Sequence, residues 1–262
     1  QALAEQKNAR HVVWGASRGS ANTRQLEDGF LRSAGLGASL TPPLSLALDD
    51  EGIYYDPHHP SRLEHLIARA PVDQSALTRA GSLKHKLIEL GLSKYNLRGQ
   101  PFRRPEHPRV ILAVGQVEDD ASIRLGASHV KTNLGLLEAI KQAAPEAYII
   151  YKPHPDVEAG LRPGAVDAEG LADEVAVNIS ANDILQVVDE VWTITSLLGF
   201  EALIRGVKVI TLGAPFYAGW GLTTDRGDIP TRRTARPSLD QLIHATLIDY
   251  PMYRDPISGL AC

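Results

Sequence analysis

Acidic, basic and hydroxyl side chains follow four apolar segments in the second half of the chain. The apolar segments, which we expect to be strands, are Arg109–Val114, Ala147–Tyr151, Val191–Ile194 and Val207–Leu212. The polar segments directly after them are Gly115–Asp120, Lys152–Asp156, Thr195–Glu201 and Gly213–Gly221. In a parallel sheet covered by helices on both faces, ligands bind beyond the carboxyl ends of the strands. We therefore expect the four polar segments to converge on one binding site.

Two of these segments contain the groups that bind a nucleotide. Ser196, preceded by Thr195, stands before a helical pattern, where a hydroxyl and free backbone N–H groups suit a phosphate. Lys152 and His154 would add cationic or hydrogen-bonding donors from the adjacent loop. Glu201 lies about one turn into the same helix, where its carboxylate could accept both hydroxyls of a ribose. Phosphate together with ribose indicates a nucleotide.

Each segment also has a simpler interpretation. Thr195 and Ser196 can serve as a helix N-cap and nothing more. The segment Lys152–Pro155 can form a rigid turn with a solvated histidine. Tyr217 and Trp220 can fill the core beneath a loop. The functional interpretation gains weight only because all these segments follow strands of one predicted sheet.

Two acidic clusters could supply the carboxylates of a glycosyl transfer. Glu27 and Asp28 precede a glycine in the first half, and Asp119 and Asp120 follow the first strand of the second half. If the halves face one another, the clusters lie across a cleft. One carboxylate could then attack or stabilise an anomeric carbon while the other handles the proton. The simpler interpretation of each cluster is a turn or a helix N-terminus, where carboxylates complement the helix dipole.

Motifs for other ligands are missing from the sequence. There is no Gly-x-x-x-x-Gly-Lys-Ser/Thr loop, and Gly35-Leu36-Gly37 lacks the third glycine of a dinucleotide fingerprint. The segment His58–His65 is rich in histidine, but a proline and the spacing argue against a metal-binding helix. Asp49–Gly52 lacks the alternate-residue spacing of a calcium loop and favours a hairpin turn. We therefore predict no metal site.

Short strands alternate with helical patterns along the whole chain, which predicts an α/β fold. In the first half we expect a strand at His11–Trp14, a second short element that leads into Leu26, and strands at Ser45–Asp49 and Gly52–Tyr55. A helical pattern follows over residues 60–92. The last two strands would form a hairpin. Three prolines and three arginines within residues 96–108 predict a linker. Beyond it we expect a further strand at Val175–Ile179 and helices at Asn133–Ala144, Ala181–Val188, Ser196–Arg205 and Ser238–Thr246, the last packing back across the domains.

The composition excludes several classes of protein. The chain has 262 residues, of which 44% are hydrophobic, typical of a globular protein with a core. Its 27 Lys and Arg against 31 Asp and Glu argue against binding nucleic acid by bulk charge. No apolar run approaches the length of about 18 residues that a membrane span needs. The only cysteine, Cys262, excludes a disulfide framework, and because the chain opens at Gln1 we expect an excised piece of a longer protein.

Several of these strings occur together in one known family. In the first half they are Glu27-Asp28-Gly29-Phe30-Leu31-Arg32-Ser33 and Gly35-Leu36-Gly37. In the second half they are Gly115-Gln116-Val117-Glu118-Asp119-Asp120, Tyr151-Lys152-Pro153-His154-Pro155-Asp156, Thr195-Ser196-Leu197-Leu198-Gly199-Phe200-Glu201 and Pro215-Phe216-Tyr217-Ala218-Gly219-Trp220-Gly221. From about Val13 to its end, the chain resembles the KpsC-like β-Kdo glycosyltransferase modules of bacterial capsule polysaccharide assembly. It is more distantly similar to bacterial sialyltransferases.

This resemblance implies a glycosyltransferase fold of the B type, with two Rossmann-like domains facing across a cleft. We expect an acceptor-side domain over residues 1–103 and a donor-binding domain over residues 104–262. The donor implied is CMP-β-Kdo, and the implied acceptor is a Kdo-terminated, lipid-linked oligosaccharide. Transfer with retention would give the β-Kdo linker of a capsule polysaccharide, without a metal or other cofactor.

The resemblance also implies a role for each site residue. Asp120, spaced from Gln116 as in the family's Gln-x-x-x-Asp motif, is the expected nucleophile, with Asp119 as the alternative. Glu27 is the expected acid/base, with Asp28 as the alternative. The residues expected to bind the substrate or its nucleotide are Gln116, Lys152, His154, Pro155, Thr195, Ser196, Glu201 and Tyr217. Among these, His154, Ser196 and Lys152 would hold the phosphate, and Glu201 the ribose.

Relatives in this family carry two such modules in tandem, so we expect a second transferase module in the full-length protein. The resemblance implies a cytoplasmic location at the inner face of the inner membrane, with peripheral membrane contact and no nucleic-acid partner. Two alternatives stay open. One is a transferase for another CMP-activated acid sugar, such as sialic acid, and the other is a non-catalytic module that binds nucleotide or glycan.

Overall fold

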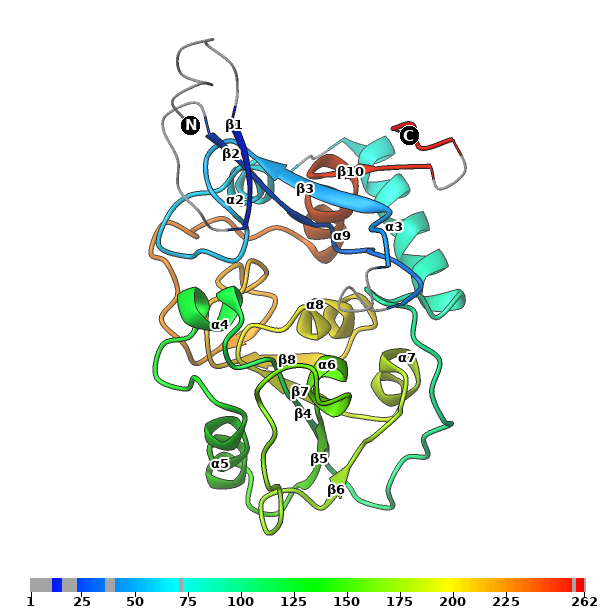
Figure 1. Cartoon of the computed structure of the whole chain (residues 1–262), viewed down its shortest axis with the longest axis vertical. Coiled ribbons are helices and arrows are strands. Elements are labelled where there is room, and N and C mark those ends of the chain that lie inside the picture. The colour runs from blue at the N-terminus through cyan, green and yellow to red at the C-terminus, as the bar shows by residue number, and fades with distance from the viewer. Residues whose placement is uncertain (1–10, 16–22, 36–40, 71–72, 256–257, 262) are drawn as a thin grey trace.

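The computed structural model describes residues 11–15, 23–35, 41–70, 73–255 and 258–261. Within them the chain forms two sheets with helices packed around each, one in the upper and one in the lower half of Figure 1. The predicted α/β class is confirmed. Four residues used above, Gln1, Leu36, Gly37 and Cys262, lie outside the described residues.

The second half of the chain builds a six-stranded parallel sheet in the order β6-β5-β4-β7-β8-β9. Its strands are β4 (Val110–Val114), β5 (Tyr148–Lys152), β6 (Glu174–Val175), β7 (Glu190–Thr193), β8 (Lys208–Thr211) and β9 (Thr224–Asp225). Its helices are α4 (Ala121–Gly126), α5 (Asn133–Ala143), α6 (Pro155–Glu158), α7 (Ala181–Leu185) and α8 (Leu197–Ile204). β5 and β6 lie on one side of β4, and β7 and β8 lie on its other side. The direction of the strand order therefore changes between β4 and β7, and the loops that follow these two strands lie side by side at the carboxyl edge of the sheet.

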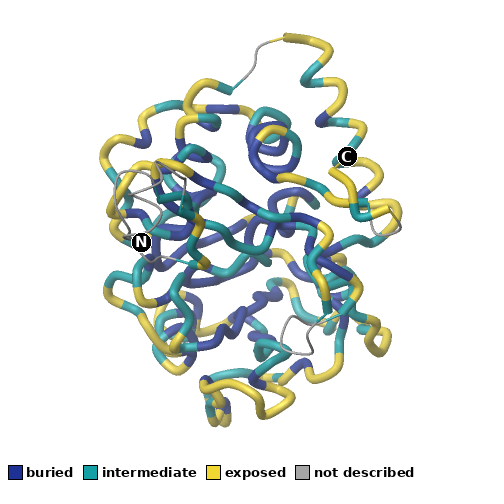
Figure 2. Tube along the Cα trace, turned by 45° about the horizontal axis from the view of Figure 1, so that its top comes forward, coloured by how far each residue is buried: buried dark blue, intermediate teal, exposed yellow. Residues whose placement is uncertain are grey.

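The central strand β4 shows why this sheet forms where it does. All five of its residues are buried, which requires apolar side chains on both faces. Val110, Leu112 and Val114 contribute to one hydrophobic core, and the alternating residues Ile111 and Ala113 to another. The first core also contains residues of the first half, so the two halves share one apolar interior. Figure 2 shows buried segments running through both halves.

The first sheet has four strands in the order β1-β2-β3-β10. They are β1 (His11–Trp14), β2 (Thr23–Asp28), β3 (Ser45–Asp49) and β10 (Pro251–Tyr253). Only β1 and β2 are parallel, whereas β3 runs antiparallel to both of its neighbours. Within the described residues this sheet therefore departs from the all-parallel Rossmann pattern of the second half.

The predicted hairpin between Ser45–Asp49 and Gly52–Tyr55 is wrong. Both edges of β3 are taken by other strands, since β2 pairs on one side and β10 on the other. The chain instead turns inward after β3, because the Asp49 carboxylate accepts hydrogen bonds from the backbone N–H groups of Glu51, Gly52 and Arg62. Residues 54 and 55 therefore lie outside the strands, and the Tyr54 ring packs against Phe30 and Tyr250.

Helices of the first half and the end of the chain pack together. The helical pattern over residues 60–92 forms two helices, α2 (Arg62–Ala68) and α3 (Gln74–Glu89), each begun by a side-chain N-cap. The last helix, α9 (Leu239–Ile243), continues as the π-helix η2 (His244–Asp249) and leads into β10. Lys84 of α3 pairs with Asp240 of α9 at 2.6 Å. The end of the chain thus lies with the first half, and the boundary between residues 103 and 104 stays a prediction.

Several other predicted bounds shift by a few residues. The strand expected at Val175–Ile179 covers only Glu174–Val175, and the helix expected at Ala181–Val188 ends at Leu185. In the described part of the chain, no helix is both long and apolar enough to span a bilayer.

Candidate active site

A cavity of about 390 Å³ lies where the end of β2 meets the loops after β4, β5 and β7. The predicted site residues that line it are Glu27, Asp28, Gln116, Asp120, Lys152, His154, Pro155, Thr195, Ser196 and Glu201. Asp119 and Tyr217 are the two predicted residues that do not line it. The structure therefore brings together residues from both halves of the chain that lie far apart in sequence.

Asp120 lies on the cavity wall as the N-cap of α4. Its Oδ1 accepts hydrogen bonds from the Ser122 N–H at 2.8 Å and the Ser122 hydroxyl at 2.7 Å. The simpler interpretation, a helix cap, is thus also correct, and the cap holds the carboxylate in one orientation. Asp119 lies outside the cavity, where it is more than half exposed and pairs with Arg162 at 2.6 Å.

Glu27 and Asp28 end β2 and line the cavity from the first half. Asp28 is already ion-paired with Arg32, whose side chain is buried. Glu27 forms no ion pair with a described residue; its carboxylate accepts the Asp28 N–H at 3.0 Å and the Tyr55 hydroxyl at 3.4 Å. Burial raises the pKa of Glu27, and these hydrogen bonds and the Lys94 charge offset the rise only partly. Of the two carboxylates, Glu27 is better suited to exchange a proton.

His154 acts as a neutral hydrogen-bond donor rather than as a cation. Its Nδ1 accepts the Asp156 N–H at 3.1 Å, which assigns the ring proton to Nε2. Burial lowers the pKa of His154 to about 4, outweighing the nearby Asp156 carboxylate. Lys152 also lines the cavity, but its Nζ donates to the Ile179 carbonyl at 2.6 Å. Its pKa is lowered by burial.

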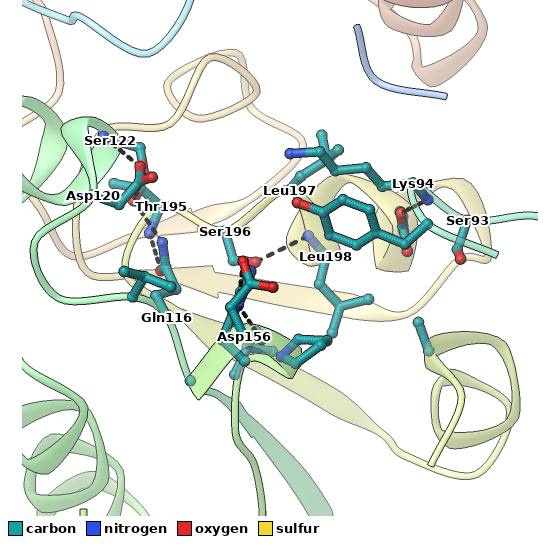
Figure 3. Close-up of a pocket in the computed structure, with 18 of the residues that line it drawn as sticks. Ser93, Lys94, Gln116, Asp120, Ser122, Asp156, Thr195, Ser196, Leu197 and Leu198 are labelled. Carbon is teal, nitrogen blue, oxygen red and sulfur yellow. Dashed lines mark hydrogen bonds and ion pairs between the residues drawn. The ribbon is translucent and has the colours of Figure 1, made fainter. Parts of the chain in front are cut away.

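Ser196 opens α8 at the centre of the site, between Asp120 and Lys94 in the view of Figure 3. Its hydroxyl accepts the Leu198 N–H at 3.2 Å and still lines the cavity. Tyr217 is fully buried behind it and donates its hydroxyl hydrogen bond to the Ser196 carbonyl at 2.5 Å. Tyr217 therefore supports the Ser196 turn, and its predicted contact with the nucleotide does not fit this position.

Gln116 joins the loop after β4 to the loop after β7. Its side-chain amide donates to the Thr195 hydroxyl at 3.0 Å, and its carbonyl oxygen accepts the Thr195 N–H at 2.8 Å. These paired contacts are buried. They fix the relative position of the two loops that carry Asp120 and Ser196. The side chain of Gln116 therefore acts mainly by positioning these two residues.

Glu201 is buried on the α8 side of the cavity. Its Oε1 accepts the backbone N–H of Lys94 at 2.7 Å. Burial raises the pKa of Glu201, and the Lys94 N–H and the Arg205 charge lower it less. The carboxylate thus anchors the segment that joins the halves as well as lining the cavity.

The lining residues that the sequence analysis did not assign to the site include Tyr54, Tyr55, Ser93, Lys94 and Arg162. The two tyrosines were assigned to a strand of the incorrect hairpin. Ser93 and Lys94 stand just before the predicted linker and belong to no motif. No local pattern in the sequence marks these residues, because contacts with distant segments bring them to the site.

Metal-ligand clusters are absent from the described residues: no three His, Cys, Asp or Glu side chains are arranged to hold an ion there. The cavity instead presents hydroxyl, imidazole and ammonium groups beside the N-termini of α4, α6 and α8. These are donors suited to an anion, and they face carboxylates from both halves.

Two relatives are half identical to the chain. Capsule polysaccharide modification protein LipA of Neisseria meningitidis serogroup B is 50% identical over 236 residues, which are 88% of this chain and 33% of LipA. Lipopolysaccharide-processing protein LpsZ of Rhizobium meliloti is 49% identical over 238 residues, 87% of this chain and 54% of LpsZ. The chain thus spans about a third of the length of LipA and about half of LpsZ.

Solved structures share the fold. The β-Kdo 2,4 transferase of Thermosulfurimonas dismutans KpsC superposes with a TM-score of 0.86 and 35% identity, covering 96% of this chain and 83% of that one. The β-Kdo 2,7 transferase of the same KpsC gives a TM-score of 0.80 and 39% identity, covering 100% and 84%. The resemblance to KpsC-like proteins is confirmed. Since the sequence also matches the family described as capsule polysaccharide biosynthesis protein over residues 4–97 and 82–253, the chain belongs to that family.

Proposed function

We propose that this chain is a retaining glycosyltransferase that moves Kdo from CMP-β-Kdo to a Kdo-terminated, lipid-linked oligosaccharide, building the β-Kdo linker of a capsule polysaccharide. One observation carries the proposal: Glu27 from the first half and Asp120 from the second line the same cavity beside His154 and Ser196. That arrangement combines two carboxylates for glycosyl chemistry with donors for a leaving phosphate. The similarity to two KpsC Kdo transferases supports the choice of sugar.

The nucleotide lies along the carboxyl ends of β5 and β7. His154 donates from Nε2 and Ser196 from its hydroxyl to the CMP phosphate, at the N-termini of α6 and α8. Lys152, which also lines the cavity, adds positive charge, and Glu201 accepts ribose hydroxyls. These groups stabilise the charge that develops on CMP as it leaves.

The reaction takes two displacements. An Asp120 carboxylate oxygen attacks the anomeric carbon, the bond from that carbon to the phosphate oxygen breaks, and CMP departs with the electron pair. Because Oδ1 is held by Ser122, Oδ2 is the oxygen free to attack. The acceptor hydroxyl then attacks the same carbon, Glu27 takes the hydroxyl proton, and Asp120 leaves as a carboxylate. Two inversions give net retention.

The test is product formation from CMP-β-Kdo and a Kdo-terminated acceptor. We expect a β-linked product by NMR, undiminished by EDTA, and a Kdo adduct on the protein by mass spectrometry when the acceptor is withheld. Preference for CMP-sialic acid in a donor competition would assign another sugar. Binding of CMP without any transfer would refute the proposal and indicate a binding module.

The setting of the reaction is part of the same proposal. LipA is about three times as long as the matched segment, which leaves room for a second transferase module in the full-length protein. A CMP-activated sugar and a lipid-linked acceptor meet at the cytoplasmic face of the inner membrane, where the protein would bind peripherally. Release of the full-length protein from membranes by high salt, without detergent, tests this attachment.

A further inference from the structure

Lys94 is held at the junction of the two halves by its own backbone. Its N–H donates to Glu201 Oε1 of α8 at 2.7 Å. Its carbonyl accepts the N–H groups of Arg32 at 3.0 Å and Ser33 at 3.1 Å, from the segment after β2. The position of Lys94 is thus fixed from the donor side and from the acceptor side at once.

A tight turn on either side of Lys94 strengthens this placement. The Ser93 N–H donates to Asn96 Oδ1 at 3.0 Å, and the Asn96 N–H donates back to the Ser93 hydroxyl at 3.1 Å. Asn96 adopts a left-handed conformation with φ 49°, which asparagine tolerates better than most residues. The side chain of Arg205, the C-cap residue of α8, donates to the carbonyl of Leu92, which precedes Ser93, at 2.8 Å. Such a network is what a positioned functional side chain requires.

The Lys94 ammonium enters the cavity with its charge unpaired by a carboxylate. Its Nζ lies 5.0 Å from the centre of the Tyr95 ring, and within the described residues it forms no ion pair. Burial lowers the pKa of Lys94, but the Tyr95 hydroxyl and the charges of Asp28 and Asp120 raise it more. The net rise keeps this amine protonated at neutral pH.

The other cations lining the cavity are already engaged. Lys152 donates to the Ile179 carbonyl, and Arg162 pairs with Asp119. His154 is neutral at pH 7, because its pKa is about 4. Among the described basic residues that line the cavity, Lys94 is therefore the protonated one whose side chain is bound neither to a backbone carbonyl nor to a carboxylate.

The chemistry of a 2-keto acid sugar explains what this cation binds. Its anomeric carbon carries both the carboxylate and the oxygen of the phosphate ester, so the two anionic groups are bound within a few ångströms of each other. Two protein groups suited to these anions contact the Tyr95 ring: Lys94 Nζ lies 5.0 Å from its centre, and His154 meets it edge-on with ring centres 6.4 Å apart. Lys94 and His154 thus both lie beside the Tyr95 ring and both line the cavity, so each can bind one of the two neighbouring anionic groups.

From this arrangement we infer that Lys94 binds the carboxylate of the donor sugar and thereby selects 2-keto acid sugars over sugars without that carboxylate. The inference rests on the proposed function, because it identifies the side chain that recognises the donor sugar. Lys94 is a binding residue here, and the bond-forming groups remain Asp120 and Glu27.

The experiment compares two ligands that differ by the sugar. Titrations use Asp120→Asn protein, in which the donor is not consumed and asparagine still caps α4. In this background Lys94→Met, Lys94→Arg and the control Lys131→Met are titrated calorimetrically with CMP-Kdo and with CMP. Lys131 is exposed and lies outside the cavity.

We expect Lys94→Met to weaken CMP-Kdo binding about tenfold to a hundredfold, as for loss of a charged hydrogen bond, with CMP binding changed less than about threefold. Lys94→Arg should recover part of the loss, and Lys131→Met should lose nothing. Equal losses for both ligands would assign Lys94 to the phosphate and overturn the inference, as would unchanged CMP-Kdo binding. If Lys94→Met weakens the binding of CMP-Kdo but not that of CMP, and wild-type protein nevertheless transfers no Kdo, the proposed function fails while the role of Lys94 stands.

Discussion

Asp119 and Asp120 are adjacent in sequence but face different surroundings. The Asp119 carboxylate pairs with Arg162 at the surface, whereas the Asp120 carboxylate is held by Ser122 on the cavity wall. The turn into α4 separates the two side chains. This divergence favours Asp120 over Asp119 as the proposed nucleophile.

The first prediction uses this pair as variant and control. Asp120→Asn should lower kcat by about a thousandfold or more and abolish the Kdo adduct, because the amide cannot replace the attacking carboxylate. Asp119→Asn should change kcat less than about threefold, since an exposed ion pair contributes little. Turnover assays with intact-protein mass spectrometry measure both. An adduct on Asp120→Asn protein would move the nucleophile elsewhere.

The second prediction concerns the pH dependence contributed by Glu27. As the base of the second displacement, Glu27 must be a carboxylate, so activity falls as pH drops through its pKa. Because burial raises that pKa above 4.5, the acid limb of kcat/KM for the acceptor should lie above 4.5. Tyr55→Phe removes a hydrogen bond that lowers the pKa, so its acid limb should lie at higher pH. An acid limb unmoved in Tyr55→Phe would contradict the assignment of Glu27.

The third prediction concerns His154 and stability in acid. Between pH 6.5 and about 4 the unfolded chain binds a proton at this imidazole and the folded chain does not. The free energy of unfolding therefore falls as pH falls through this window, by up to about 3 kcal/mol from this group. In the His154→Asn variant the asparagine should still cap α6, and the free energy of unfolding should no longer fall by this amount in acid. CMP binding should weaken about tenfold.

Urea unfolding at several pH values and CMP titration measure the two effects separately. Asp156 and Lys94 face His154 and are present in both proteins, so their contributions largely cancel in the comparison. Parallel stability curves for the wild type and His154→Asn would show that His154 does not titrate as the buried site requires.

The fourth prediction separates support from binding at Tyr217. Tyr217→Phe removes the hydrogen bond to the Ser196 carbonyl from a fully buried position. We expect the free energy of unfolding to fall by about 1 kcal/mol and the affinity for CMP to change less than about threefold. A large loss of CMP affinity with unchanged stability would instead place the Tyr217 hydroxyl on the nucleotide.

The sequence determined the second half of the fold well, because its information is local. The buried strand β4 is a continuous apolar run, and polar residues follow β4, β5 and β7 directly. In parallel strands those segments must meet at one edge, so the cluster of Asp120, His154 and Ser196 follows from strand order alone.

Only the tertiary structure decided the contacts made over long separations. The pairing of β3 with β10 removed the expected hairpin, and with it the two tyrosines entered the site. The hydrogen bond from the Lys94 N–H to Glu201 joins residues 107 apart and brings to the cavity a lysine that no motif marks. Such contacts depend on which surfaces bury each other when the halves pack, and the periodicity of apolar residues along the chain does not predict them.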